Sequence, residues 1–171
     1  ITRRPPALPF GAAQVVPPPA AFLQATAEGE AALLAAVTTF TQGASRIVDL
    51  FAGCGTFTLP LAARSTVHAV EGLGAPLKAL DAGWRSAPGL NRVTTQIRDL
   101  ARNPLLPDEL DRFDAIVIDP PRAGAQNQCL EIAKSGVRTV GFVACDPVNF
   151  SRDAQILADA GYPNGFETTL M

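Results

Sequence analysis

Short apolar runs alternate with amphipathic stretches along most of the chain. Five runs rich in β-branched residues read as strands, over residues 46–51, 66–71, 92–97, 113–119 and 139–145. Apolar residues at helical spacing follow four of these runs, from about residue 56 and over 75–87, 126–136 and 149–161, whereas a proline-broken loop follows the third. Because strands that alternate with helices are joined by right-handed crossovers, the pattern predicts a parallel sheet with helices on both faces.

The N-terminal residues follow a different pattern. Residues 1–20 contain six prolines, which fix φ and remove backbone donors, so they predict an extended arm in which any strand lies at a sheet edge. Residues 21–42 are rich in alanine and leucine at helical spacing and predict a helix that ends before Gly43. We therefore expect a proline-rich arm over 1–20 and one α/β domain over 21–171.

Composition narrows the class of protein. The chain has 171 residues, 47% of them apolar, which is enough for one domain with its own core. Three cysteines without a CxxC pair and one histidine provide little for a disulfide framework or a metal site, so we expect reduced cysteines, no metal and a cytoplasmic location. A net charge of −2 gives no general basic field, so a nucleic-acid partner needs a local patch or another domain. No apolar run approaches the roughly 20 residues that cross a membrane, and the start at Ile1 suggests a fragment of something longer. We also expect a monomer.

Candidate ligand-binding residues follow the first three predicted strands, since ligands of open parallel sheets bind beyond the carboxyl ends of the strands. In "DLFAGCGTF" (49–57), Gly53 and Gly55 permit a tight turn and a close approach to a ligand, although a plain glycine turn explains this loop alone equally well. Glu71 ends the second strand, where an acid accepts hydrogen bonds from the hydroxyls of a ribose. Asp99 ends the third, and its carboxylate suits either an adenine amine or the cap of a helix.

Candidate catalytic residues follow the last two predicted strands. In "DAIVIDPPRAG" (114–124), two prolines give a rigid exit that holds Asp119 and Arg122 in a fixed direction at the sheet edge. In "VACDPVNFSRD" (143–153), Cys145 ends the fifth strand. A free cysteine is usually a small buried hydrophobic residue, but burial alone does not predict the flanking Asp-Pro and Arg-Asp pairs. We therefore expect a reactive thiol at Cys145.

The order of these motifs resembles that of a class I methyltransferase that uses S-adenosyl-L-methionine. In addition, "FLQATAEGE" (22–30) and "VACDPVNFSRD" are similar to the FxQxN and SCNPxTxxRD segments of the uracil-5 RNA methyltransferase family, which makes 5-methyluridine in tRNA and 23S ribosomal RNA. The similarity covers about residues 5–162. Departures from the family pattern include Thr56 and Asp146, each in place of an asparagine.

The resemblance implies a fold, a set of site residues and a reaction. The fold is a Rossmann-like parallel sheet that lacks the last strands of the family, in a catalytic domain truncated at both ends. With the glycine loop, the implied contacts to the cofactor are Gln24, Phe51, Gly53, Gly55, Thr56, Glu71, Asp99 and Asp119. Cys145 is the implied nucleophile, which adds to carbon 6 of a uracil in rRNA or tRNA and so activates carbon 5, with Asp119 and Arg122 beside it.

Two other functions remain open at this point. An amino-group methyltransferase carries an aromatic residue after its Asp/Asn-Pro-Pro, where this chain has Arg122. The second alternative is a module that binds the cofactor without catalysis. It is compatible with this sequence because no segment matches the one that carries the family's general base. The last eleven residues contain one acid, Glu167.

Overall fold

A parallel five-stranded sheet forms the centre of the computed structural model, which describes residues 6–21, 23 and 26–162. In chain order its strands are β3 (Arg46–Leu50), β4 (Thr66–Glu71), β5 (Val93–Ile97), β6 (Ala115–Ile118) and β7 (Thr139–Phe142). They lie in the order β5-β4-β3-β6-β7, and every neighbouring pair is parallel. The predicted α/β sheet is therefore confirmed.

The central strands are apolar because both faces of the sheet are covered. All four residues of β6 are buried, as are four of the five residues of β3, whereas Val93 alone is buried in the edge strand β5. The connections run in opposite directions on the two sides of the β3–β6 pair, since β4 and β5 lie on one side and β7 on the other. Such a switch in strand order opens a crevice at the carboxyl ends of the strands.

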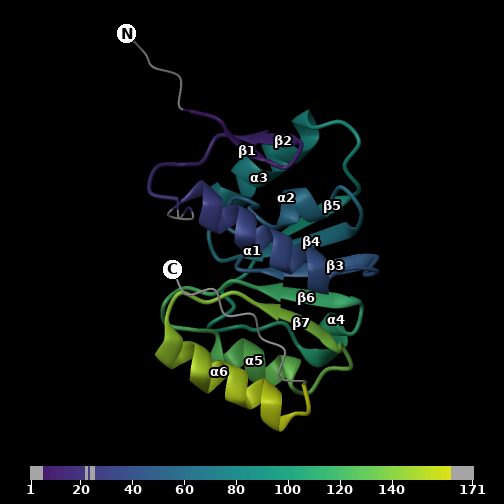
Figure 1. Cartoon of the computed structure of the whole chain (residues 1–171), viewed down its shortest axis with the longest axis vertical. Coiled ribbons are helices and arrows are strands. Elements are labelled where there is room, and N and C mark those ends of the chain that lie inside the picture. The colour runs from purple at the N-terminus through teal and green to yellow at the C-terminus, as the bar shows by residue number, and fades with distance from the viewer. Residues whose placement is uncertain (1–5, 22, 24–25, 163–171) are drawn as a thin grey trace.

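Helices cover the two faces of the sheet (Figure 1). The helices on one face are α1 (Ala27–Phe40), α2 (Thr58–Leu61) and α3 (Gly74–Ser86). Those on the other face are α4 (Pro107–Leu110), α5 (Gln126–Ile132) and α6 (Pro147–Asp159). The sheet thus separates two hydrophobic cores, and residues before about 97 build most of the first core while residues after 100 supply most of the second.

Residues 8–15 form a β-hairpin that packs against the domain. Its strands are β1 (Leu8–Phe10) and β2 (Ala13–Val15), which pair antiparallel. Phe10 and Val15 are buried, and Val15 lies so close to α3 that a Cβ atom on Gly83 would sit 2.7 Å from its Cγ2 atom. The prolines of residues 1–20 predict a domain that starts only at residue 21. Alternating burial within the hairpin instead joins these eight residues to the first core, despite the prolines around them.

Several element boundaries differ from the sequence-based prediction. The first helix begins at Ala27 and not near residue 21, because Thr26 is its N-cap and its Oγ1 atom accepts from Gly29 N at 3.0 Å. The helix predicted from residue 56 is the single turn α2, and the predicted proline-broken loop contains the short helix α4, which starts at Pro107.

The segment around Cys145 also departs from the prediction. Strand β7 ends at Phe142, so Cys145 lies in a loop and not at the end of the strand. Asp146 is the N-cap of α6, and its Oδ1 atom accepts from Val148 N at 3.1 Å and from Asn149 N at 2.9 Å. Pro147 occupies the first position of the helix, where its missing N–H costs nothing. The Asp-Pro pair that suggested chemistry therefore has a capping role.

Candidate active site

A cavity of about 850 Å³ opens at the carboxyl ends of β3, β4, β6 and β7. The loops that follow these four strands line most of it, and Leu33 of α1 and residues 18–21 complete the lining. Its surface is mostly apolar with a few polar side chains, which is typical of a pocket for a small organic ligand. The cavity lies at the edge of the sheet where the sequence predicts a ligand site.

The structure gathers seven of the predicted site residues around this cavity. They are Phe51, Gly53, Thr56, Glu71, Asp119, Arg122 and Cys145. Gly55 and Asp99 are not among the lining residues, and Gln24 lies outside the described part of the chain. The residues that come together include both predicted catalytic groups of the loop after β6.

Glu71 connects the loops that follow β3 and β4. Its Oε2 atom accepts from Gly53 N at 3.1 Å, and its Oε1 atom accepts from Leu73 N at 3.0 Å. Each carboxylate oxygen can accept more than one hydrogen bond, so the side chain retains capacity for a ligand in the cavity. The acid predicted to bind a ribose thus also fixes the shape of its own site.

Three residues of the loop after β3 have left-handed backbone conformations. Gly53 (φ +53°) faces open space where a side chain would be. At Gly55 (φ +96°), a Cβ atom would lie 2.8 Å from Leu80 Cγ of α3, so the missing side chain permits close packing against this helix, while the contact of Gly55 with a ligand stays a prediction. Phe51 has φ +63°, a conformation that costs a bulky residue about 1–2 kcal/mol and is often found at functional sites.

We expect Gly55→Ala to destabilise the chain by about 2–3 kcal/mol, because it adds left-handed strain and a clash with α3. Gly43→Ala is a matched control, since Gly43 also has positive φ (+85°) but nothing within 4 Å of the added atom. The control should lose about 1 kcal/mol. Urea unfolding of both variants measures the difference, and equal losses would show that the contact with Leu80 is relieved at no cost.

Two acids near the cavity are poorly solvated. Asp49 is fully buried in β3; its Oδ2 atom accepts from Thr58 Oγ1 at 2.5 Å, and its Oδ1 atom has no hydrogen-bond partner among the described residues. Burial raises the pKa of Asp49 to about 7, and the charge of Glu71 adds to the shift. Burial likewise raises the pKa of Asp119 to about 7, helped by Asp49. Asp49 is not among the residues that the sequence motifs predict, although an acid inside an apolar strand is a visible signal.

Cys145 is the exposed one of the three thiols. It lies at the cavity, which contradicts its interpretation as a small buried hydrophobic residue. Cys54 and Cys129 are buried, and burial raises the pKa of both thiols, which keeps them protonated. Of the three, Cys145 therefore has the best access to a substrate.

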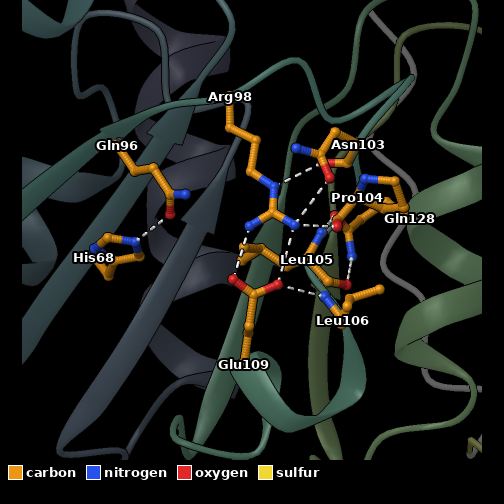
Figure 2. A network of polar contacts seen from close by, with 9 residues as sticks. All are labelled: His68, Gln96, Arg98, Asn103, Pro104, Leu105, Leu106, Glu109 and Gln128. Atoms are coloured by element: carbon orange, nitrogen blue, oxygen red, sulfur yellow. Dashed lines mark hydrogen bonds and ion pairs between the residues drawn. The ribbon is translucent and has the colours of Figure 1, made fainter.

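Asp99 belongs to a local turn. Its Oδ1 atom accepts from Ala101 N at 3.1 Å and from Arg102 N at 3.3 Å, the capping arrangement that the sequence left open beside a contact to adenine. The neighbouring Arg98 holds the loop after β5: it donates to Glu109 at 2.7 Å, to Asn103 O at 2.7 Å and to Pro104 O at 2.5 Å (Figure 2). Asp99 therefore caps a local turn and is not among the residues that line the cavity, and its contact with adenine stays a prediction.

The described residues contain neither a membrane-spanning helix nor a cluster of metal-ligating side chains. In this part of the chain, no helix combines the length and the apolar composition that crossing a bilayer requires. The same residues contain no cluster of three or more His, Cys, Asp or Glu side chains arranged to hold a metal ion.

The sequence matches no protein-family model, but it is similar to curated RNA methyltransferases. An uncharacterized RNA methyltransferase of Mesorhizobium japonicum is 53% identical over 162 residues, which cover 95% of this chain and 39% of the relative. The 23S rRNA (uracil(1939)-C(5))-methyltransferase RlmD of Chromohalobacter salexigens is 40% identical over 147 residues, or 84% of this chain and 30% of the relative. The chain thus spans less than two fifths of these curated relatives.

A solved structure shares the fold. The Pyrococcus abyssi tRNA (uracil-54, C5)-methyltransferase, in complex with S-adenosyl-L-homocysteine, has a TM-score of 0.76 and 21% sequence identity, and the match covers 88% of this chain and 37% of that one. The class I methyltransferase fold is therefore confirmed, as is the resemblance to uracil-5 RNA methyltransferases that the sequence motifs predicted.

Proposed function

We propose that this chain is the core of an S-adenosyl-L-methionine-dependent methyltransferase that modifies carbon 5 of a uridine in rRNA or tRNA. One observation carries the proposal: a single cavity joins Glu71, Asp119, Arg122 and the exposed thiol of Cys145. The similarity to RNA methyltransferases, one of them specific for uracil in 23S rRNA, supports it. An amino-group methyltransferase needs no thiol, so the position of Cys145 favours methylation of carbon.

The cavity has the size and the chemistry for the cofactor. Its volume of about 850 Å³ lies within the usual range of small-ligand pockets. Glu71 would hold the ribose, the backbone around Gly53 would lie against the ligand, and the loops after β6 and β7 would face its reactive end. When bound, S-adenosyl-L-methionine supplies an electrophilic methyl group on a sulfonium.

Cys145 would provide the nucleophile. Its thiolate forms a bond to carbon 6 of the uracil, which turns carbon 5 into an enolate carbon that can take the methyl group. Carbon 5 then loses its proton to a base, and the bond between sulfur and carbon 6 breaks, which returns the thiolate. Arg122 lines the cavity beside this thiol and would offer its positive charge to the RNA or to the enolate oxygen. Glu167, the acid of the C-terminal tail, lies outside the described residues.

The test is the 5-methyluridine content of cellular RNA. Mass spectrometry of rRNA and tRNA fragments from a strain that lacks the gene should show the loss of 5-methyluridine at one position, and the gene should restore it on a plasmid. An unchanged content at every position in both RNA classes would contradict the proposed reaction.

Glu71→Gln should weaken binding of S-adenosyl-L-homocysteine by about 1.5–3 kcal/mol, the range for hydrogen bonds to a charged group. The change keeps the shape of the side chain but removes its charge and one acceptor. Glu131→Gln is a suitable control, because Glu131 lies on α5 and pairs with Lys134. Calorimetric titration that finds equal affinity for Glu71→Gln and the control would remove this acid from the ligand site.

A further inference from the structure

We infer that Asn149, Arg152 and Asp153 are positioning residues that fix the loop carrying Arg122 against the helix that follows Cys145. The inference rests on the proposed function, in which Arg122 and the thiol act on one substrate. The three side chains are called the α6 lock below. Their spacing places them on one face of α6, within its first two turns.

The α6 lock holds the backbone of the loop after β6 at three successive points. Asn149 Nδ2 donates to Arg122 O at 2.8 Å, and Arg152 Nη2 donates to Ala123 O at 3.2 Å. Ala125 N donates to Asp153 Oδ2 at 2.6 Å. Three hydrogen-bonding side chains of α6 therefore define where this loop lies relative to the helix.

The members of the α6 lock also hold one another. Arg152 Nη1 donates to Asn149 Oδ1 at 3.0 Å, and Arg152 Nε donates to Asp153 Oδ1 at 2.8 Å. The Asp153 side chain is fully buried, so its ion pair with Arg152 is shielded from water on the carboxylate side. Gly124 (φ +80°) permits the close fit, because a Cβ atom there would lie 2.5 Å from both Arg152 Nη2 and Asp153 Oδ2.

The lock adjoins the candidate nucleophile. A small hollow beside the main cavity is lined by residues of the lock, by Pro121 and Arg122, and by Cys145 itself. Helix α6 starts two residues after Cys145 and is capped by Asp146 between them, so the helix start determines the position of the thiol. By tying Arg122 to the same helix, the lock sets the position of the guanidinium relative to the sulfur.

A positioning role and a merely structural role predict different results. Small displacements of reacting groups reduce the rate of chemistry far more than they reduce binding, by as much as about a hundredfold for 1 Å. If the lock only stabilised the fold, its loss would lower Tm, and activity would fall only with the fraction of folded protein.

The test uses the complete protein that carries this chain, with Asn149→Ala as the main variant because Asn149 is uncharged. Arg152→Met removes more of the lock, and Arg152→Lys keeps its charge. Gln155→Ala is the matched control: Gln155 is exposed on the same helix and bonds Asp159. At saturating RNA and cofactor, we expect Asn149→Ala and Arg152→Met to slow single-turnover methyl transfer by at least about tenfold, with partial recovery in Arg152→Lys. The KM for RNA, from a separate steady-state titration, should stay within about twofold. A rate equal to that of the control, or a loss matched by the folded fraction, would overturn the inference.

Alkylation of Cys145 by iodoacetamide tests the lock even if the wild-type protein methylates no RNA. Because Pro121 and Arg122 line the hollow beside the exposed thiol, freeing their loop should widen the approach to the sulfur and speed alkylation at least about threefold in Asn149→Ala, measured by mass spectrometry of the Cys145 peptide. A rate at or below that of wild type and the control would overturn the inference. Absence of methyl transfer with faster alkylation would instead reject only the proposed function.

Discussion

Replacing Cys145 with alanine is expected to reduce methyl transfer by at least about a thousandfold, as the loss of a covalent nucleophile does in other enzymes. The reaction depends on the sulfur in two ways: its addition activates carbon 5, and its departure releases the product. The thiol is exposed at the cavity, so its removal should disturb packing little. Loss of activity with an unchanged Tm would assign the effect to chemistry.

The covalent step can be trapped with RNA that carries 5-fluorouridine. Fluorine at carbon 5 cannot leave as a proton, so the adduct should persist and shift the protein band on a denaturing gel. Cys129→Ala serves as the matched control, since Cys129 is buried in the second core, and this variant should still form the adduct. A shifted band with Cys145→Ala would show that another residue is the nucleophile.

The second large effect concerns stability and pH. The pKa of Asp49 is raised from 3.8 to about 7 in the folded chain, so the folded state holds a proton that the unfolded state releases. The free energy of unfolding that comes from binding this proton is fully present below about pH 4 and is lost as the pH rises toward 7. Each pH unit of this interval lowers the free energy of unfolding by about 1.36 kcal/mol, so the total loss from Asp49 reaches up to about 4 kcal/mol. The raised pKa of Asp119 acts in the same direction.

Asp49→Asn should therefore be more stable than wild type at pH 8, by up to about 4 kcal/mol, and similar to it at pH 4. An amide keeps the shape of the acid and has no charge to bury. Urea unfolding at both pH values measures the effect, with Asp159→Asn as the control because Asp159 is exposed on α6. If Asp49→Asn keeps the wild-type dependence on pH, Asp49 is not the group that binds the proton.

The sheet could be predicted from the sequence because its signals are local. Each strand is a short run of β-branched residues and each longer helix has apolar residues at helical spacing, so the five strands of the parallel sheet were found without three-dimensional information. The hairpin at residues 8–15 was not found, since prolines suggested an arm and its buried alternation is only three residues long on each strand. Proline restricts the backbone but does not decide whether a strand packs on a domain.

The candidate site could be predicted in position but only partly in detail. Motifs at strand ends located seven lining residues, because parallel strands bring their carboxyl ends to one edge. The pairing of Glu71 with Gly53 N depends on how two loops meet, and no local pattern contains it. The same holds for Gly55, whose neighbour Leu80 is twenty-five residues away in the chain. At Asp146 the local pattern suggested too much, because the Asp-Pro pair that was interpreted as a sign of catalysis is the cap of a helix.

The division of the two hydrophobic cores along the chain has a consequence for biosynthesis. Residues up to about 97 contain β3, β4, β5 and the three helices of the first face, so this half can begin to fold as it emerges during translation. Until residues 100–162 follow, the opposite side of the nascent sheet, with Val48, Leu50 and Val70, has no cover. A nascent chain that has emerged only to about residue 97 would therefore present an apolar β surface to chaperones, whereas one that has emerged through residue 162 would not.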